Sequence, residues 1–154
     1  MTKLRTSPRL RSFDYVGPFG YSLSLVTRGR APAFAERDVV DATLDCLGRS
    51  CARYGFFLHA YCFMPDHLHL LISGDDGAPL RDFVRHFKQL SGHRYKREYG
   101  ARLWQISYYD HVLRKDEDLM VAARYIWDNA VRAGLVQDRS EYPFSGPRSM
   151  MEQA

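Results

Sequence analysis

The sequence contains few cysteines and no long apolar run. Cys46, Cys51 and Cys62 are odd in number and form no C-x-x-C pair, so we expect no disulfides and interpret them as buried free thiols. No segment of about 18 consecutive apolar residues is present, and residues 1–11 are basic and polar. We therefore expect neither a transmembrane helix nor a secretory signal, and we predict a cytoplasmic protein.

The chain also lacks an internal repeat, a low-complexity stretch and a linker long enough to divide its 154 residues. A chain of this length can bury about two thirds of its unfolded surface. Its 45% hydrophobic and 26% charged residues are an ordinary globular composition. We predict one domain over residues 19–148, with a basic arm over residues 1–18 before it and a tail over residues 149–154 after it.

Negative charge is not in excess: the formal net charge is +4. Positive charge is concentrated in two segments. Residues 1–30 hold six Lys and Arg against one acid, and residues 81–114 hold eight against three, with seven aromatic residues interleaved. A basic surface with aromatic side chains can neutralise phosphates and stack on unpaired bases. A soluble basic protein whose aromatics are core residues would show the same composition.

Apolar periodicity alternates between strand and helix patterns along the chain. We predict strands over residues 21–27, 56–64, 68–72 and 103–113, and helices over residues 38–54, 80–97 and 116–134. This β-α-β-β-α-β-α order is typical of an α+β fold, the ferredoxin-like or RRM-like sandwich, in which a central antiparallel sheet carries its helices on one face.

A first candidate site lies on the second strand of the predicted hairpin, in the sequence PDHLHLLI at residues 65–72. Side chains alternate across a strand, so His67 and His69 should point to the same face with backbones about 7 Å apart. Two imidazoles placed in this way can converge on one divalent ion. An H-x-H pair alone is a weak signal, because most such pairs are surface or hydrogen-bonded histidines.

A second candidate site lies in the last predicted helix. Tyr125 and Asn129 are four residues apart and should stack on one face of this helix, at the shoulder of its apolar stripe. A side chain in this position borders the core and still meets solvent. A tyrosine that simply lies at the core boundary fits the same pattern.

Taken together, these motifs resemble the single-tyrosine HUH transposases, and in particular their REP-associated branch. The matching segments are YCFMPDHLHLLI at residues 61–72, LWQ at 103–105, YYDHVLR at 108–114, YIWDNAVRAGLV at 125–136 and YPFS at 142–145. The resemblance covers roughly residues 8–148 in the same order. One departure is Ala130, where the family usually has proline after the asparagine. Because alanine continues a helix readily, we expect a straighter helix here.

The resemblance implies a function and assigns its residues. Tyr125 would be the catalytic nucleophile, His67 and His69 the metal-binding pair, and Asn129 a third metal ligand, with Mg²⁺ or Mn²⁺ as the ion. The implied activity is a metal-dependent single-strand DNA endonuclease and strand transferase that acts at DNA hairpins through a covalent 5′-phosphotyrosine intermediate. Its implied partner is single-stranded DNA beside a hairpin, such as a repetitive extragenic palindrome.

Further residues are candidates for a supporting role. His111 lies on the strand that leads towards the tyrosine helix, where the family often has histidine, and is a possible residue near the site. Phosphate contacts are expected from the basic arm and from six cations of the second helix: Arg81, Arg85, Lys88, Arg94, Lys96 and Arg97.

Three alternatives share most of these features. The chain could be a catalytically idle protein that binds DNA hairpins, an RRM-like RNA-binding module, or a metal phosphoesterase whose nucleophile is water. An RRM needs stacking aromatics in a Lys/Arg-Gly-aromatic pattern on its central strands, and residues 68–72 lack this pattern. Whether the protein is a monomer or a homodimer, and whether the tyrosine completes its own site or that of a partner, stays open from sequence alone.

Overall fold

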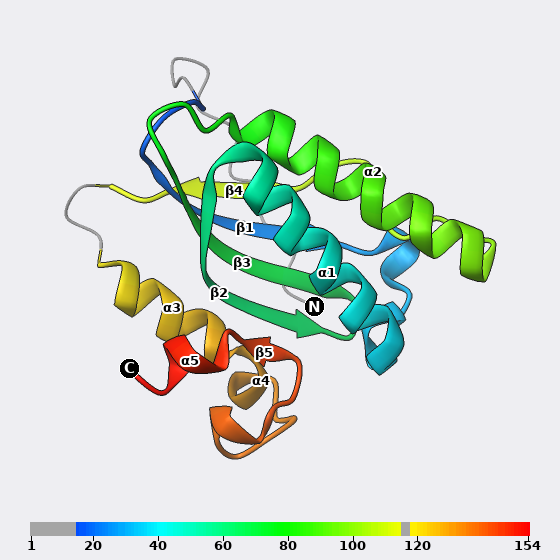
Figure 1. Cartoon of the computed structure of the whole chain (residues 1–154). Helices are drawn as coiled ribbons and strands as arrows, with labels where there is room; N and C mark the ends of the chain where they lie inside the picture. Colours follow the sequence, from blue (N-terminus) through cyan, green and yellow to red (C-terminus); the bar gives the residue numbers. More distant parts are fainter. Residues whose placement is uncertain (1–14, 115–117) are drawn as a thin grey trace.

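The fold is built on a five-stranded antiparallel sheet in the order β4-β1-β3-β2-β5 (Figure 1). The computed structural model describes residues 15–114 and 118–154. The strands are β1 (Gly20–Val26), β2 (Phe56–Met64), β3 (His67–Gly74), β4 (Tyr109–Val112) and β5 (Ser145–Gly146). The helices are α1 (Arg37–Tyr54), α2 (Leu80–Tyr99), α3 (Leu119–Trp127), α4 (Asn129–Arg132) and α5 (Arg148–Met151). The predicted α+β class and antiparallel sheet are confirmed.

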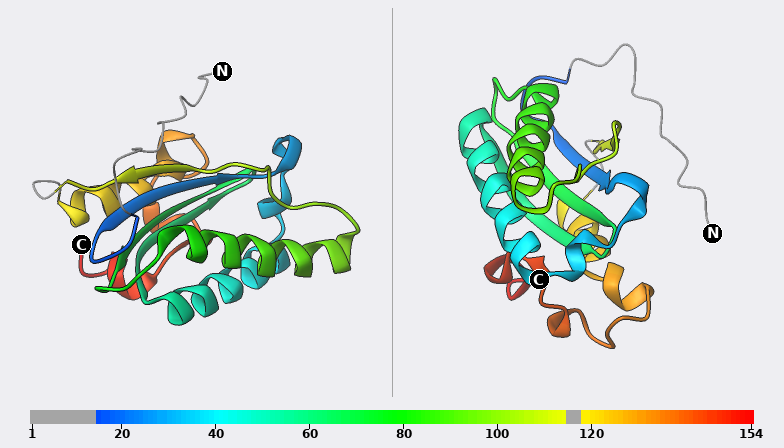
Figure 2. Two further views of the ribbon diagram at one scale, coloured as in Figure 1. Left: turned by 90° about the horizontal axis from the view of Figure 1, so that it is seen from above. Right: turned by 90° about the vertical axis from the view of Figure 1, so that its right-hand side faces the viewer.

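Strand β3 shows how the sheet divides the molecule into two layers. Its residues Leu68, Leu70 and Ile72 are buried in the larger core, against α1 and α2. Its alternate residues His67, His69 and Leu71 face the other side, where Leu71 joins a smaller core with α3. Seen from above, α1 and α2 lie on one side of the sheet and α3 and α4 on the other (Figure 2). The expectation that all helices lie on one face is therefore wrong for the last helix.

Helix α1 ends where the sequence indicates. Gly55 caps it in the left-handed conformation, at φ 75° and ψ 40°. A Cβ at this position would also crowd the carboxylate of Asp75, so that this flexible side chain would have to move. The left-handed backbone conformation is therefore the main reason for glycine at the turn from α1 into β2.

The segment that leads into β4 is less regular than its sequence indicates. We predicted a strand over residues 103–113, but β4 spans only Tyr109–Val112. Trp104 makes a single bridge to Thr27, and the Gln105 N–H still donates to the Val26 carbonyl of β1. The carbonyls of Gln105 and Ile106 instead accept hydrogen bonds from the ammonium group of Lys88, at 2.7 and 3.1 Å, so the regular pairing does not continue.

The predicted last helix is divided at Asp128. Helix α3 ends at Trp127, Asp128 adopts φ −81° and ψ 1°, and α4 begins at Asn129. The carboxylate of Asp128 accepts two hydrogen bonds of 2.8 Å from Arg139, which hold this residue at the break. The expectation that Ala130 allows a straighter helix is therefore wrong. The predicted start of this helix, at residue 116, lies outside the described residues. Among the described residues, Asp118 is the N-cap of α3, and its carboxylate accepts a hydrogen bond from the Met120 N–H.

The ends of the chain pack more closely than the sequence suggests. Tyr15, placed in the predicted arm, is buried in the larger core. In the predicted tail, Met150 and Met151 pack against the smaller core. The four cations of the arm before residue 15 lie outside the described residues. All three cysteines are free and buried, as predicted. Within the described ranges, no helix is both long enough and apolar enough to span a bilayer.

Candidate active site

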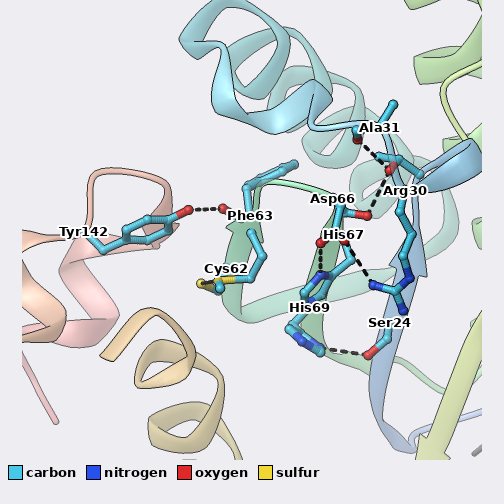
Figure 3. A network of polar contacts seen from close by, with 11 residues as sticks. Ser24, Arg30, Ala31, Cys62, Phe63, Asp66, His67, His69 and Tyr142 are labelled. Atoms are coloured by element: carbon cyan, nitrogen blue, oxygen red, sulfur yellow. Dashed lines mark hydrogen bonds and ion pairs between the residues drawn. The ribbon is translucent and has the colours of Figure 1, made fainter. Parts of the chain in front are cut away.

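The two histidines of β3 form the centre of the candidate site (Figure 3). Strand alternation places both on the face opposite α1 and α2. Their ring centroids are 4.6 Å apart and their planes are nearly perpendicular, at 89°. The predicted pair of neighbouring imidazoles is thus present on one side of the sheet.

Hydrogen bonds orient both rings. His67 donates from Nδ1 to the Asp66 carboxylate at 2.7 Å, and Asp66 also accepts from Arg30 at 3.0 Å. His69 shares a 2.8 Å hydrogen bond between Nδ1 and the hydroxyl of Ser24. Because Nδ1 of each ring is engaged, Nε2 is the nitrogen that can bind an ion, and a partner at Nδ1 is the usual way in which proteins orient histidine ligands.

Electrostatics favour the neutral form of His69. Burial, followed by the charges of His67 and Arg132, lowers its pKa from 6.5 to about 3. At neutral pH this imidazole therefore keeps the lone pair that a metal ligand needs. Burial alone would raise the pKa of Asp66, but hydrogen bonds from His67 and Arg30 lower it overall, so that this carboxylate stays charged.

Tyr125 lies on the outer side of α3, on the same face of the sheet as the histidines. Its side chain is 65% exposed, whereas Ile126 and Trp127 are buried against the sheet. The indole N–H of Trp127 donates to the Gly146 carbonyl at 2.9 Å, which ties α3 to β5. The chain thus fixes the helix through its buried side and leaves the phenol open to solvent, as the periodicity predicts.

Arg132 connects the tyrosine and the asparagine. Its guanidinium carbon lies 3.8 Å from the centroid of the Tyr125 ring, and its Nη2 donates to Oδ1 of Asn129 at 3.3 Å. The sequence analysis did not select Arg132. Its spacing, seven residues after Tyr125 and three after Asn129, is a signal that could have identified it, because these positions share a helix face.

The tyrosine and asparagine segment adjoins the histidine pair through Cys62. This residue is the direct cross-strand partner of His69 on β2, and it lies in the smaller core together with Ala130. Arg132 is also close enough for its charge to lower the pKa of His69. The structure therefore brings Ala130, the residue after Asn129, to the face of the sheet on which His69 lies.

The donor set fits a hard or borderline divalent ion rather than a thiolate-bound one. Among the described residues, no group of three His, Cys, Asp or Glu side chains could hold a metal. The candidate ligands are two imidazole nitrogens and the amide oxygen of Asn129, a mixed set that suits Mn²⁺ better than Mg²⁺. In this structure the same amide oxygen accepts a hydrogen bond from Arg132.

His111 lies on the same face as the histidine pair but in a different row. It pairs with Ser22 on β1, whereas the row of His69 contains Ser24 and Tyr109. His111 is exposed on the edge strand β4. Its proposed role near the site stays a prediction, and Tyr109 is the residue of β4 that shares the row of His69.

The cations of α2 divide into two groups. Arg81, Arg85, Lys88 and Lys96 line two hollows beside this helix. Arg94 instead pairs with Asp45 of α1 at 3.0 Å, and Arg97 is exposed near the end of the helix. Arg94 thus helps to join the two helices, which separates it from the other predicted phosphate contacts.

Comparisons with known proteins identify the family. The family model described as IS200-like transposase matches residues 17–129. A Haemophilus influenzae protein assigned to the REP-associated tyrosine transposases is 30% identical over an alignment of 139 positions, which covers 81% of this chain and 77% of that protein. The REP-associated tyrosine transposase of Escherichia coli K12 is 29% identical over an alignment of 94 positions, which covers 58% of this chain and 53% of that protein.

Solved structures share the fold. A REP-associated tyrosine transposase bound to a REP hairpin superposes with a TM-score of 0.75 at 21% identity, over 88% of this chain and 80% of that one. A Deinococcus radiodurans protein assigned as a transposase gives a TM-score of 0.56 at 26% identity, over 76% of this chain and 95% of that one. The segment that the family model matches, residues 17–129, contains the histidine pair, Tyr125 and Asn129. The chain therefore belongs to the IS200-like transposase family.

Proposed function

We propose that this transposase-family protein is a metal-dependent single-strand DNA endonuclease and strand transferase that acts at DNA hairpins. The observation that carries the proposal is the common location of the two groups. His67 and His69 project from β3 on the face that α3 covers, and Tyr125 and Asn129 belong to the α3–α4 segment whose buried residues pack on that face.

Tyr125 is the proposed nucleophile. Its phenolic oxygen attacks the scissile phosphorus and loses its proton, while the bond from phosphorus to the 3′ oxygen breaks and that oxygen takes up a proton. The products are a 5′-phosphotyrosine link and a free 3′-hydroxyl. This exchange of one phosphate ester for another keeps the bond energy, so a second 3′-hydroxyl can reverse the step and join new strands without ATP.

His67, His69 and Asn129 are the proposed ligands of Mg²⁺ or Mn²⁺. An ion bound there would withdraw negative charge from the scissile phosphate. The chain supports this role by orienting both rings through Asp66 and Ser24. Arg132 would add a second positive charge: its planar fork can bind two phosphate oxygens, and its stacking on Tyr125 places that fork beside the phenol.

Single-stranded DNA beside a hairpin is the proposed substrate. The structural neighbour described above is bound to a REP hairpin. In this chain the basic side of α2 offers cations for phosphate contacts. We place the chemistry on the α3 side of the sheet and sequence-independent contacts on the α2 side.

Trapping of a covalent adduct tests the nucleophile. The protein is incubated with Mn²⁺ and single strands that contain short imperfect hairpins of the repetitive extragenic palindrome type, and the modified peptide is mapped by mass spectrometry. We expect the adduct on Tyr125. Tyr125→Phe should abolish adduct and cleavage while hairpin binding persists, and the exposed Tyr99→Phe serves as a matched control. Undiminished cleavage by Tyr125→Phe would indicate attack by water.

Chelation and ligand substitution test the metal. EDTA should stop adduct formation, and added Mn²⁺ should restore it. His67→Ala and His69→Ala should each weaken Mn²⁺ binding, measured by calorimetry without DNA. Unchanged Mn²⁺ affinity in both variants would exclude this pair as the ligands, whatever the outcome for Tyr125.

A further inference from the structure

A groove runs along α2 on the side away from α1. It consists of two adjoining hollows between α2 and residues 102–108, with volumes of about 460 and 330 Å³. Lys88, Gln89 and Ile106 line both hollows, so the two are continuous. We call this feature the α2 groove. It lies outside the candidate active site, at the edge of the sheet beyond β1.

The charge of the α2 groove has one sign. Arg81 and Arg85 line the first hollow, and Lys96 and Arg102 line the second. No acidic residue is among those that line either hollow. On α2 these cations recur at helical spacing along one face, which forms a row that matches a phosphate backbone.

Ile106 stands between the two hollows. Its side chain is 93% exposed, the highest value among the large apolar side chains of the described residues. The backbone beneath it is fixed, because the Lys88 ammonium group binds the carbonyls of Gln105 and Ile106. An apolar side chain held out into water on a rigid support has no packing role in the chain itself, and it is surrounded by cations.

The α2 groove leads to the histidine pair. The N–H of Gln105 donates to the carbonyl of Val26 at 3.1 Å, and Val26 pairs with His67 across β1 and β3. Two strand spacings of about 4.8 Å each therefore separate the backbone at Gln105 from that at His67, or roughly 10 Å. A strand that leaves the groove at Ile106 has to cross only the edge of the sheet and β1 to reach His67.

We propose that the α2 groove binds the paired stem of a DNA hairpin and that Ile106 packs against the last base pair, where the stem opens into single strand. The cations bind stem phosphates on both sides of Ile106. The isoleucine covers the base face that the junction leaves open, in the manner of apolar side chains that insert at base steps. The protein would thereby recognise the position of the junction by shape and deliver the adjoining single strand towards His67.

This inference rests on the proposed hairpin substrate, and binding measurements test it apart from the chemistry. The probe is a fluorescein-labelled DNA hairpin with an unpaired tail, compared with an unstructured strand of equal length, by fluorescence anisotropy with Tyr125→Phe protein and EDTA. Ile106→Ser should weaken hairpin binding about tenfold, the value of one buried aliphatic side chain, and should lower the ratio of hairpin to unstructured affinity. The matched control is Phe57→Ser, which replaces another exposed apolar side chain.

Charge substitutions test the stem contacts. Arg85→Ala and Lys96→Ala should each reduce the slope of log affinity against log salt by about one. Arg49→Ala on α1 removes the same charge from an exposed position outside the groove and should leave the slope unchanged. Ile106, Arg85 and Lys96 are at the surface, so melting temperatures should stay within a degree or two of the parent.

Two results would overturn the proposal. Hairpin binding that is equal in Ile106→Ser, Arg85→Ala and the parent would place the stem elsewhere, while adduct formation on Tyr125 could still support the proposed function. Tighter binding of an RNA hairpin than of the DNA hairpin, lost in the same variants, would make the groove an RNA site. Groove-dependent DNA binding without any adduct would leave this inference standing and refute the chemistry.

Discussion

The two faces of the sheet are built for different tasks. The face under α1 and α2 is filled by a continuous apolar core that includes Phe83, Phe87 and Leu70, all fully buried. The opposite face has a smaller core around Trp127 beside β2, and further along β3 it presents His67 and His69 instead of apolar side chains. The face under α1 and α2 therefore provides most of the stability. The opposite face buries less apolar surface and carries polar side chains that can bind an ion.

The largest expected effect is a loss of stability when a buried side chain of the face under α1 and α2 is truncated. Phe87→Ala should lower the free energy of unfolding by about 3–5 kcal/mol, because the ring is fully buried against Phe83 and Trp104. Urea unfolding followed by circular dichroism measures it. Phe57→Ala, at an exposed aromatic, should change stability by less than about 0.5 kcal/mol. Equal losses in both variants would contradict the division between the faces.

The next effect concerns the face of the sheet that carries the histidine pair and α3. Arg132→Ala should slow formation of the Tyr125 adduct about 100-fold, equivalent to about 2.7 kcal/mol, because a charge-assisted donor beside the phenol is lost. Arg132→Lys should recover part of the rate, since it keeps the charge but not the planar fork. Arg132 is exposed, so both variants should unfold like the parent. Single-turnover kinetics give the rates, and a fully active Arg132→Ala would remove this residue from the site.

A smaller effect tests the orientation of the ligands. Ser24→Ala removes the hydroxyl that holds Nδ1 of His69 and should weaken Mn²⁺ binding about tenfold. Ser22→Ala is the control, two residues earlier on the same strand and face but paired with Leu71 and His111. Calorimetric titration measures both affinities. If the two variants bind Mn²⁺ equally well, Ser24 does not orient the ligand.

A dependence of stability on pH stands outside this ranking, because its size grows with the pH interval that is measured. The pKa of His69 falls from 6.5 to about 3 on folding, mainly through burial. Between these values the unfolded chain binds a proton that the folded chain does not, so the free energy of unfolding decreases as pH falls from about 6.5, by at most about 1.4 kcal/mol per pH unit. The loss is complete near pH 3. His69→Gln should show a shallower decline between pH 7 and 5 in urea titrations, and an equal slope would refute the contribution.

Much of the fold could be predicted because local patterns determine it. The alternation in β3 gives the side on which His67 and His69 lie, and Gly55 marks the end of α1. The path of residues 103–108 could not be predicted, because the ammonium group of Lys88, distant in sequence, replaces the strand partner. The break at Asp128 depends likewise on Arg139, and local helix propensity carries no information about that contact.

The sequence motifs select the candidate residues of the site, but they do not select the residues that hold those side chains in place. His67, His69, Tyr125 and Asn129 follow from the motifs, and the structure gathers their elements on one face. Ser24 and Asp66 could not be selected, because their roles depend on cross-strand register and on the rotamer of a neighbouring histidine. For the cations of α2, helical periodicity alone does not tell Arg94, which faces α1, from Lys96, which faces the groove.

Strand β3 lies in the middle of the five strands, with ladders to β1 and β2 along its whole length. Each amide proton of β3 bonds to β1 or to β2, so its exchange requires one of these long ladders to open, whereas α3 can detach by losing its contacts with β2, β3 and β5. Hydrogen exchange should therefore be slower in β3 than around Tyr125. The spacing of the two imidazoles would therefore survive local openings that release the phenol.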